Sequence, residues 1–528
     1  MAAWAALVPC CLLAGCRSRP AGSSATWSGV HFLCTGWEAR DKPQHARQRH
    51  GPALLAGDPP RLVELEVPGL TQFQALGVSA DGRWLAVTGV RRGEELALYV
   101  VPGRGAPPQP ASPNAKLMPG RQPYVFQWGP TGSCFALIDS LSRVFAGEAS
   151  SGPAQQVGRA RFADFVMPSD MKPPVLVWSD NGDRLAWTGV DSRLDLLDLH
   201  GVPPLHETKL AADRFVWAPG GGRLVCLTWD FGKHATRYAI VPFPEGREIA
   251  IDREGQITPA ESPTPVYWSP DGTRLAVARR GYPYTELVLF REDGTRLREE
   301  KVEPGFWFFR WLTDGSGVVC ARRAAPLWLV PAGPGRARQA SPAIVEDPHP
   351  KAGELMGCWM PDGTLAALNL RTSRTTEFRN LSVRQSVENG EPYFKRAASI
   401  GAVSPVGRHV LVDCAVPGDR QPAPGRLLQE RQFVGHTELY LCDLDTGHTK
   451  RLVVDLDGTG QQPIYLEVVE CRWSPDGQLV LLSYDTPAAG RGWAVVDAAT
   501  GKTTKLPIDD WSAQWIDGPR VAPSAQGP

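Results

Sequence analysis

The stretch WSPDGTR at Trp268–Arg274 returns as WSPDGQL at Trp473–Leu479. Both copies carry the residues of a tight turn, because serine bonds back to the backbone, proline presets φ and glycine supplies a positive φ. The apolar runs TRLAVARR and QLVLLSYD follow these turns, and nearly continuous apolar runs are typical of strands buried on both faces. One aromatic residue, one turn and one buried strand therefore form a unit that the chain repeats.

Degenerate copies of this unit occur along most of the chain, at steps of 39 to 51 residues and one step of 70 between Val403 and Trp473. Internal repeats of this period indicate blades or solenoid units. An alternating strand such as ELVLFREDG follows the apolar one, and a polar strand such as KTTKLPI comes last. Three to four strands graded from buried to exposed predict a propeller blade. The units begin at Val78, Trp128, Trp178, Trp217, Trp268, Trp311, Trp359, Val403, Trp473 and Trp515.

The composition agrees with an all-β protein and argues against nucleic-acid binding. The chain has 528 residues, with 56 basic and 56 acidic side chains, so the positive surface that neutralises phosphates is not expected. Eight of the 18 tryptophans stand directly before a turn. Such regular positions predict that these tryptophan side chains pack between adjacent blades rather than contact a ligand. We predict an all-β fold, a β-propeller of about ten four-stranded units, closed either as one large ring or as two smaller rings.

These units resemble the repeats of TolB-like, WD40-like (PD40) β-propellers, whose signature is a Trp-Ser-Pro-Asp-Gly turn followed by an apolar strand. The resemblance covers residues 61–518 and is strongest at Trp268 and Trp473. The familiar TolB-type ring is smaller than ten units. The resemblance implies a protein that binds other components of the cell envelope.

The N-terminus carries a targeting pattern. The apolar run in residues 1–16 is shorter than a bilayer span and is typical of a signal peptide. Its end, Leu13–Cys16, resembles the lipobox of bacterial lipoproteins, which implies that Cys16 is acylated and anchors the protein to a membrane, facing the periplasm or the exterior. No Lys or Arg precedes the apolar core, so a plain apolar N-terminus is the alternative.

Residues 17–60 are rich in Arg, His, Gly and Pro without strand-like alternation, and we expect a flexible tether there. We expect residues 519–528 to be a disordered tail. The segment RLVELEVPG from Arg61 is similar to the outer strand of a unit, whereas the last unit stops after WIDGPRVA. An N-terminal strand is therefore expected to complete the last blade and remove the open edges of the ring.

Motifs of catalysis are missing from the sequence. There is no G-x-S-x-G, no H-E-x-x-H and no C-x-x-C. We therefore predict a non-enzymatic scaffold with no catalytic residues, no metal and no cofactor, which binds an envelope protein. Two alternatives are a propeller enzyme acting on a glycan or peptide, which needs paired carboxylates, and a sensor for a small ligand.

Two further features carry expectations. The insertion at 417–436, with Arg420, Arg426 and Arg431, is either a loop that reaches a partner or a solvated decoration. Cys226 and Cys320 lie in apolar strands and are expected to be buried thiols, and a disulfide involving Cys358 or Cys471 stays open.

Overall fold

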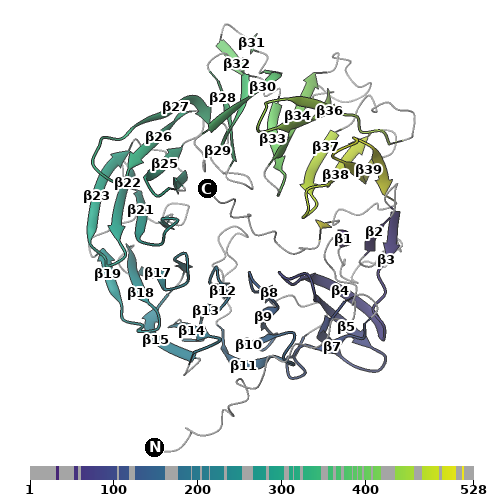
Figure 1. The fold of residues 1–528 in the computed structure, drawn as a ribbon, viewed down its shortest axis with the longest axis vertical. Helices are drawn as coiled ribbons and strands as arrows, with labels where there is room; N and C mark the ends of the chain where they lie inside the picture. Colours follow the sequence, from purple (N-terminus) through teal and green to yellow (C-terminus); the bar gives the residue numbers. More distant parts are fainter. Residues whose placement is uncertain are drawn as a thin grey trace, which may run out of the picture.

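The computed structural model shows a single ring of ten radial β-sheet units, which we call blades 1 to 10 (Figure 1). Every described regular element is a β-strand, and neighbouring strands within a blade pair antiparallel. The sequence is compatible with one large ring or two smaller rings, and the structure has one ring. The described residues are 31–34, 53–56, 61–103, 106–117, 125–160, 176–191, 193–201, 205–212, 214–230, 235–252, 266–280, 285–302, 308–312, 314–321, 325–345, 355–360, 364–369, 374–382, 385–388, 391–394, 398–405, 408–417, 435–456, 467–486, 490–506 and 514–515.

Each blade runs from an inner strand at the ring's centre to an outer strand at its rim (Figure 1). The first five blades are blade 1, with β41 (Gln514–Trp515), β1 (His31–Cys34), β2 (Ala53–Ala56) and β3 (Arg61–Glu64); blade 2, with β4 (Leu70–Val78), β5 (Leu85–Arg91), β6 (Leu96–Val101) and β7 (Gln109–Pro110); blade 3, with β8 (Val125–Trp128), β9 (Cys134–Ile138), β10 (Arg143–Glu148) and β11 (Gln155–Arg159); blade 4, with β12 (Leu176–Trp178), β13 (Arg184–Thr188), β14 (Arg193–Asp198) and β15 (Leu205–Ala211); and blade 5, with β16 (Arg214–Trp217), β17 (Arg223–Asp230), β18 (Ala235–Pro242) and β19 (Ile249–Asp252).

The second half of the ring continues the same order. Its blades are blade 6, with β20 (Val266–Trp268), β21 (Arg274–Arg280), β22 (Thr285–Arg291) and β23 (Arg296–Val302); blade 7, with β24 (Phe308–Trp311), β25 (Gly317–Ala321), β26 (Ala325–Pro331) and β27 (Arg338–Val345); blade 8, with β28 (Leu355–Trp359), β29 (Thr364–Asn369) and β30 (Arg374–Ser382); blade 9, with β33 (Ala398–Val403), β34 (His409–Pro417), β35 (Gly435–Asp443) and β36 (Thr449–Leu452); and blade 10, with β37 (Glu467–Trp473), β38 (Leu479–Thr486), β39 (Gly490–Asp497) and β40 (Thr503–Leu506).

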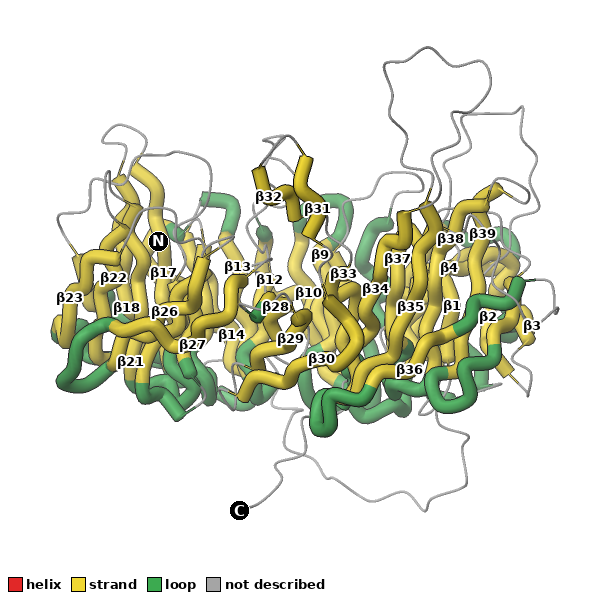
Figure 2. The backbone as a smooth tube through the Cα atoms, turned by 90° about the horizontal axis from the view of Figure 1, so that it is seen from above, coloured by secondary structure: helices red, strands yellow, loops and turns green. Residues whose placement is uncertain are grey.

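Blade 8 departs from the predicted four strands. It has three, and the end of β27 pairs with β28, so blades 7 and 8 form one seven-stranded sheet. A separate hairpin of β31 (Gln385–Glu388) and β32 (Glu391–Phe394) follows β30 and rises from one side of the ring (Figure 2). The sequence repeat does not reveal the missing fourth strand of blade 8, because the unit at Trp359 keeps its turn and its buried strand and differs only in its outer part.

The quoted turn builds its blade as the sequence predicts. The backbone N–H of Arg274 donates to Ser269 Oγ at 2.9 Å, and Gly272 has a φ of +70°. The strand that follows is β21, in which Leu275 and Ala276 are fully buried. It packs between the two neighbouring blades, since Leu275 belongs to a cluster with blade 5 and Ala276 to one with blade 7. The core of the molecule is therefore a series of apolar seams between blades.

The tryptophans before the turns lie in these seams, as predicted. Trp217, Trp268, Trp311 and Trp473 are each at most 8% exposed. Their indole N–H groups also bond across the seam, since Trp268 Nε1 donates to the carbonyl of Val216 at 3.2 Å. Val216 directly precedes Trp217, the tryptophan before the turn of the preceding blade. The same bond to the equivalent carbonyl is made by Trp128, Trp217, Trp311, Trp473 and Trp515.

Both ends of the described chain close the ring in blade 1. Leu33 of β1 pairs with Trp515 of β41, and β2 and β3 complete the sheet outward. The outer strand begins at Arg61, as predicted. Strands β1 and β2 lie within residues 17–60, where we expected a tether, so the propeller begins at His31 rather than at Arg61. Each strand has four residues, too few for alternation to appear in the sequence.

Candidate binding site on the inner wall

A cavity of about 530 Å³ lies on the inner wall of the ring, where β4, β8 and β12 of blades 2, 3 and 4 meet. These three strands are neighbours on the inner side of the ring (Figure 1). The volume falls within the roughly 300–1,000 Å³ typical of ligand pockets.

Equivalent positions of three successive units line this cavity. Each unit contributes the last residues of its inner strand and the start of its turn, so the walls repeat the same pattern three times. The strands supply mostly apolar side chains, which are Leu76, Val78, Phe126, Trp128, Leu176 and Trp178. The turns supply Ala80, Pro130 and Asp180 at one shared position.

Asp180 carries the only charge among the described lining residues. It stands where the other two units that line the cavity have Ala80 and Pro130, and where the quoted turn has Pro270. Partial burial raises the pKa of its carboxyl. The turn itself is held by Ser179, whose hydroxyl donates to Asn181 Oδ1 at 2.7 Å and accepts from the Arg184 N–H at 3.0 Å.

The seam between blades 3 and 4, beside this cavity, lacks the hydrogen bond that the indole N–H makes to the preceding blade in other seams. Trp178 lines the cavity and is 9% exposed, yet its buried Nε1 has no hydrogen-bond partner. Trp187 of β13 lies in the same apolar cluster, and its buried Nε1 is likewise unpaired. Leaving a buried donor unpaired costs roughly 1–3 kcal/mol. The indole N–H groups of the other six described tryptophans before turns are hydrogen-bonded and avoid this cost. The seam between blades 3 and 4 therefore leaves donors unpaired where the other seams do not.

The lining of the cavity holds few titratable groups. Glycosidic hydrolysis needs two carboxyl groups flanking the bond. Among the described lining residues there is one carboxylate, Asp180, beside the neutral Gln127 and Ser179. In the described part of the chain, no three His, Cys, Asp or Glu side chains are grouped so that they could hold a metal ion.

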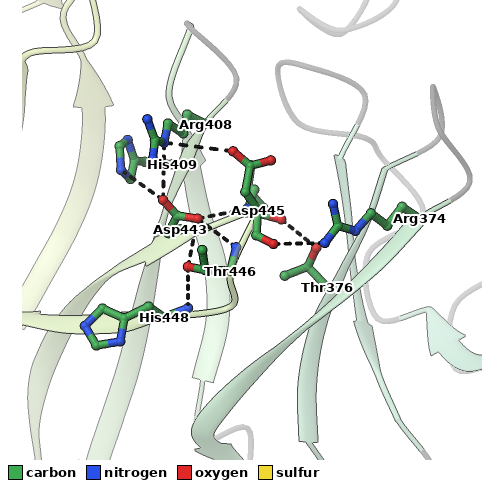
Figure 3. A network of polar contacts seen from close by, with 9 residues as sticks. Arg374, Thr376, Arg408, His409, Asp443, Asp445, Thr446 and His448 are labelled. Carbon is green, nitrogen blue, oxygen red and sulfur yellow. Dashed lines mark hydrogen bonds and ion pairs between the residues drawn. The ribbon is translucent and has the colours of Figure 1, made fainter.

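A second polar cluster joins blades 8 and 9 near the rim (Figure 3). Asp443 Oδ1 accepts from the Thr446 hydroxyl at 2.9 Å and from the Thr446 backbone N–H at 2.8 Å, and Arg408 Nε donates to Oδ2 at 3.3 Å. Burial by itself would raise the pKa of this carboxyl, but these hydrogen bonds and one from the Asp445 N–H outweigh burial and lower the pKa to about 2.

This cluster is a structural turn. Blade 8 holds it in place, because Thr376 Oγ1 donates to the carbonyl of Leu444 at 2.7 Å and Arg374 Nη2 donates to that of Asp445 at 2.9 Å. Blade 10 repeats the arrangement, since Asp497 Oδ1 accepts from the Thr500 hydroxyl at 2.9 Å. The aspartate therefore shapes a turn that recurs in successive blades, and in blade 9 this turn is bonded to blade 8.

The described cysteines are free thiols. Cys226 and Cys320 are buried, as predicted, and burial raises the pKa of both thiols. Cys358 and Cys471 are free thiols, and burial raises the pKa of each to about 12.

Two other predicted features fall largely outside the described residues. Cys16, the predicted lipidation site, lies there, as do Arg420, Arg426 and Arg431 of the insertion. The insertion joins β34 to β35, whose ends at Pro417 and Gly435 are paired. No helix in the described part of the chain is long and apolar enough to cross a membrane.

Sequence reasoning missed the cavity, although it contained one signal for it. The unit at Trp178 has WSDNG where the quoted unit has WSPDG, which replaces a turn-forming proline with a carboxylate. The three segments that form the cavity are about fifty residues apart in sequence, and only the closure of blades around an axis brings them together.

No protein-family model and no curated protein matches the chain. Among solved structures, it is similar to the C-terminal WD40 domain of Sif2, with 12% identity over 70% of this chain and 94% of that one, at a TM-score of 0.34. It is also similar to the β-propeller domain of the Trilobed protease from Pyrococcus furiosus, with 10% identity over 74% of this chain and 97% of that one, at a TM-score of 0.28.

A third similar structure is a putative dipeptidyl aminopeptidase IV from Bacteroides ovatus ATCC 8483, with 12% identity over 85% of this chain and a TM-score of 0.37. The chain spans 62% of that protein's length. At such identities the likeness concerns the fold. The ring of ten blades makes the chain an all-β propeller, and its structural neighbours include a WD40 domain and another β-propeller domain.

Proposed function

We propose that the protein is a non-enzymatic, TolB-like scaffold of the bacterial cell envelope, held at the membrane by an acylated Cys16, which binds an envelope protein through the inner wall of its ring. The cavity at β4, β8 and β12 carries this proposal. Its walls combine apolar side chains with polar groups, and its described lining holds a single carboxylate, which suits recognition and lacks the pair of acids that glycosidic hydrolysis requires.

A pull-down from bacterial envelope extract tests this function. The full chain, tagged at its C-terminus, is expected to recover one partner protein in stoichiometric amount. Wild type is expected in the membrane fraction and the Cys16→Ala variant in the soluble fraction, because the acyl chains contribute about 0.8 kcal/mol per buried methylene. Turnover of a glycan or peptide by the purified protein would refute the scaffold.

The volume of the cavity favours a second candidate, a sensor for a small ligand. A ligand that binds only the native state raises the melting temperature, and the rise grows with the logarithm of the ligand concentration above Kd. Stabilisation by one metabolite or cell-wall fragment, with no protein recovered in the pull-down, would select the sensor over the scaffold.

A further inference from the structure

We propose that the inner-wall cavity binds a basic side chain of the partner protein, an ammonium or guanidinium group on an apolar stem, with Asp180 as its counter-ion. This inference rests on the proposed function, since it names the chemistry by which the partner is held.

The turn does not need a carboxylate at position 180. Ala80 of blade 2 and Pro130 of blade 3 occupy the same position, and Ser79 of blade 2 forms the same turn bonds as Ser179. A charged residue at a site where uncharged residues suffice calls for another cause, and ligand binding is such a cause.

The carboxylate of Asp180 is also uncompensated. It is exposed and makes no hydrogen bond or ion pair with any residue that the structure describes. Other carboxylates of these turns are engaged, since Asp271 accepts from the Ser269 hydroxyl and from the Thr273 N–H. The carboxylate of Asp180 is therefore open to a cation that enters the cavity.

The remaining walls suit the rest of such a side chain. Phe126, Trp128 and Trp178 line the cavity beside Asp180. Aromatic faces attract ammonium and guanidinium groups, and the methylene stems of Lys and Arg bury well against apolar surface.

Calorimetric titration of the full chain tests the proposal. The probes are the acetylated, amidated tripeptides Leu-Arg-Leu and Leu-Gln-Leu, with agmatine as a free guanidinium. Wild type is expected to bind the arginine peptide about fivefold more tightly than the glutamine peptide, as fits an ion pair with an exposed carboxylate. Equal binding of the two peptides would overturn the proposal. Agmatine carries a guanidinium group without a peptide, so if it bound as tightly as the arginine peptide, the claim that the ligand is a side chain of a protein would fail.

Variants separate the site from the fold. Asp180→Asn and Asp180→Ala are expected to remove the preference for arginine, and Ala80 shows that alanine fits this turn. Asp191→Asn is the matched control, because Asp191 is an exposed carboxylate in the same blade at the turn between β13 and β14 and does not line the cavity. A preference that survives in the Asp180 variants, or is lost in Asp191→Asn, would refute the assignment.

The pull-down distinguishes this inference from the proposed function. If wild type and Asp180→Asn recover the same partner equally, the scaffold stands and the cavity assignment fails. If the arginine peptide binds through Asp180 and wild type recovers no partner, the cation site stands and the scaffold fails.

Discussion

Replacing Gly447 by alanine tests whether close approach between neighbouring blades holds the ring together. Gly447 lies in the turn between β35 and β36 with a φ of +70°, and an added Cβ would overlap the backbone carbonyl oxygen of Glu377 in blade 8. A left-handed conformation costs alanine about 1–2 kcal/mol. The overlap adds about 1–3 kcal/mol, because the obstacle is backbone and the blades must separate. We expect a total loss of about 2–5 kcal/mol in the free energy of unfolding.

Gly501 provides the matched control. It occupies the same position in the equivalent turn of blade 10, with a φ of +78°, but its added Cβ would meet only Leu452 Cδ2 at 3.8 Å and Lys450 Nζ at 3.9 Å. Gly501→Ala therefore costs the conformational part alone, about 1–2 kcal/mol.

Urea unfolding followed by tryptophan fluorescence measures both variants. Hydrogen exchange of peptides covering residues 374–382 and 443–448 locates the effect, because the Thr376 and Arg374 bonds to the turn are expected to weaken only in Gly447→Ala. Equal losses in the two variants, or faster exchange at both turns alike, would refute the role assigned to the contact between blades 8 and 9.

Four further outcomes are expected. Trp268→Phe is expected to cost roughly 1 kcal/mol more than Trp178→Phe in urea unfolding, because only Trp268 loses a hydrogen bond that is made. Removing β41 is expected to replace one cooperative melting transition by a broad one, since β1 loses its inner neighbour; an unchanged melt would show that closure is dispensable. The Asp443 pKa is lowered from 3.8 to about 2, so its stabilisation is present above pH 3.8 and is lost as the pH falls towards 2, and Asp443→Asn is expected to flatten the acid limb of the stability curve by on the order of 1 kcal/mol. The Cys226 thiol is expected to stay unlabelled by an aromatic disulfide reagent until urea unfolds the protein, and rapid labelling of the native form would contradict its burial.

The repeated part of the fold was predictable because its signals are local. The turn at Trp268 specifies its own geometry, and the apolar run after it specifies burial on both faces. Regular spacing then implies that the indoles lie between blades. Trp217, Trp311 and Trp473 are buried in such seams, as this predicts. The number of units was also predictable, since each one repeats the same short pattern.

The features that break the repeat could not be predicted in the same way. Closure depends on pairing between β1 and β41, which have four and two residues and no periodic pattern. The joining of blades 7 and 8 depends on the register of Ile344 against Trp359, a contact between strands with no signal in either one. The cavity depends on where the inner strands of three blades end, which is a property of the ring.

The closing sheet gives the protein an order of assembly. Strand β1 is synthesised before blades 2 to 10 and β41 after them, so a nascent chain can form individual blades but cannot yet seal blade 1. Until β41 leaves the ribosome, the inner edge of β1 lacks the partner it has in the ring, and such an edge is a template for pairing with other chains. Synthesis of β41 is thus a physical requirement for the ring to close.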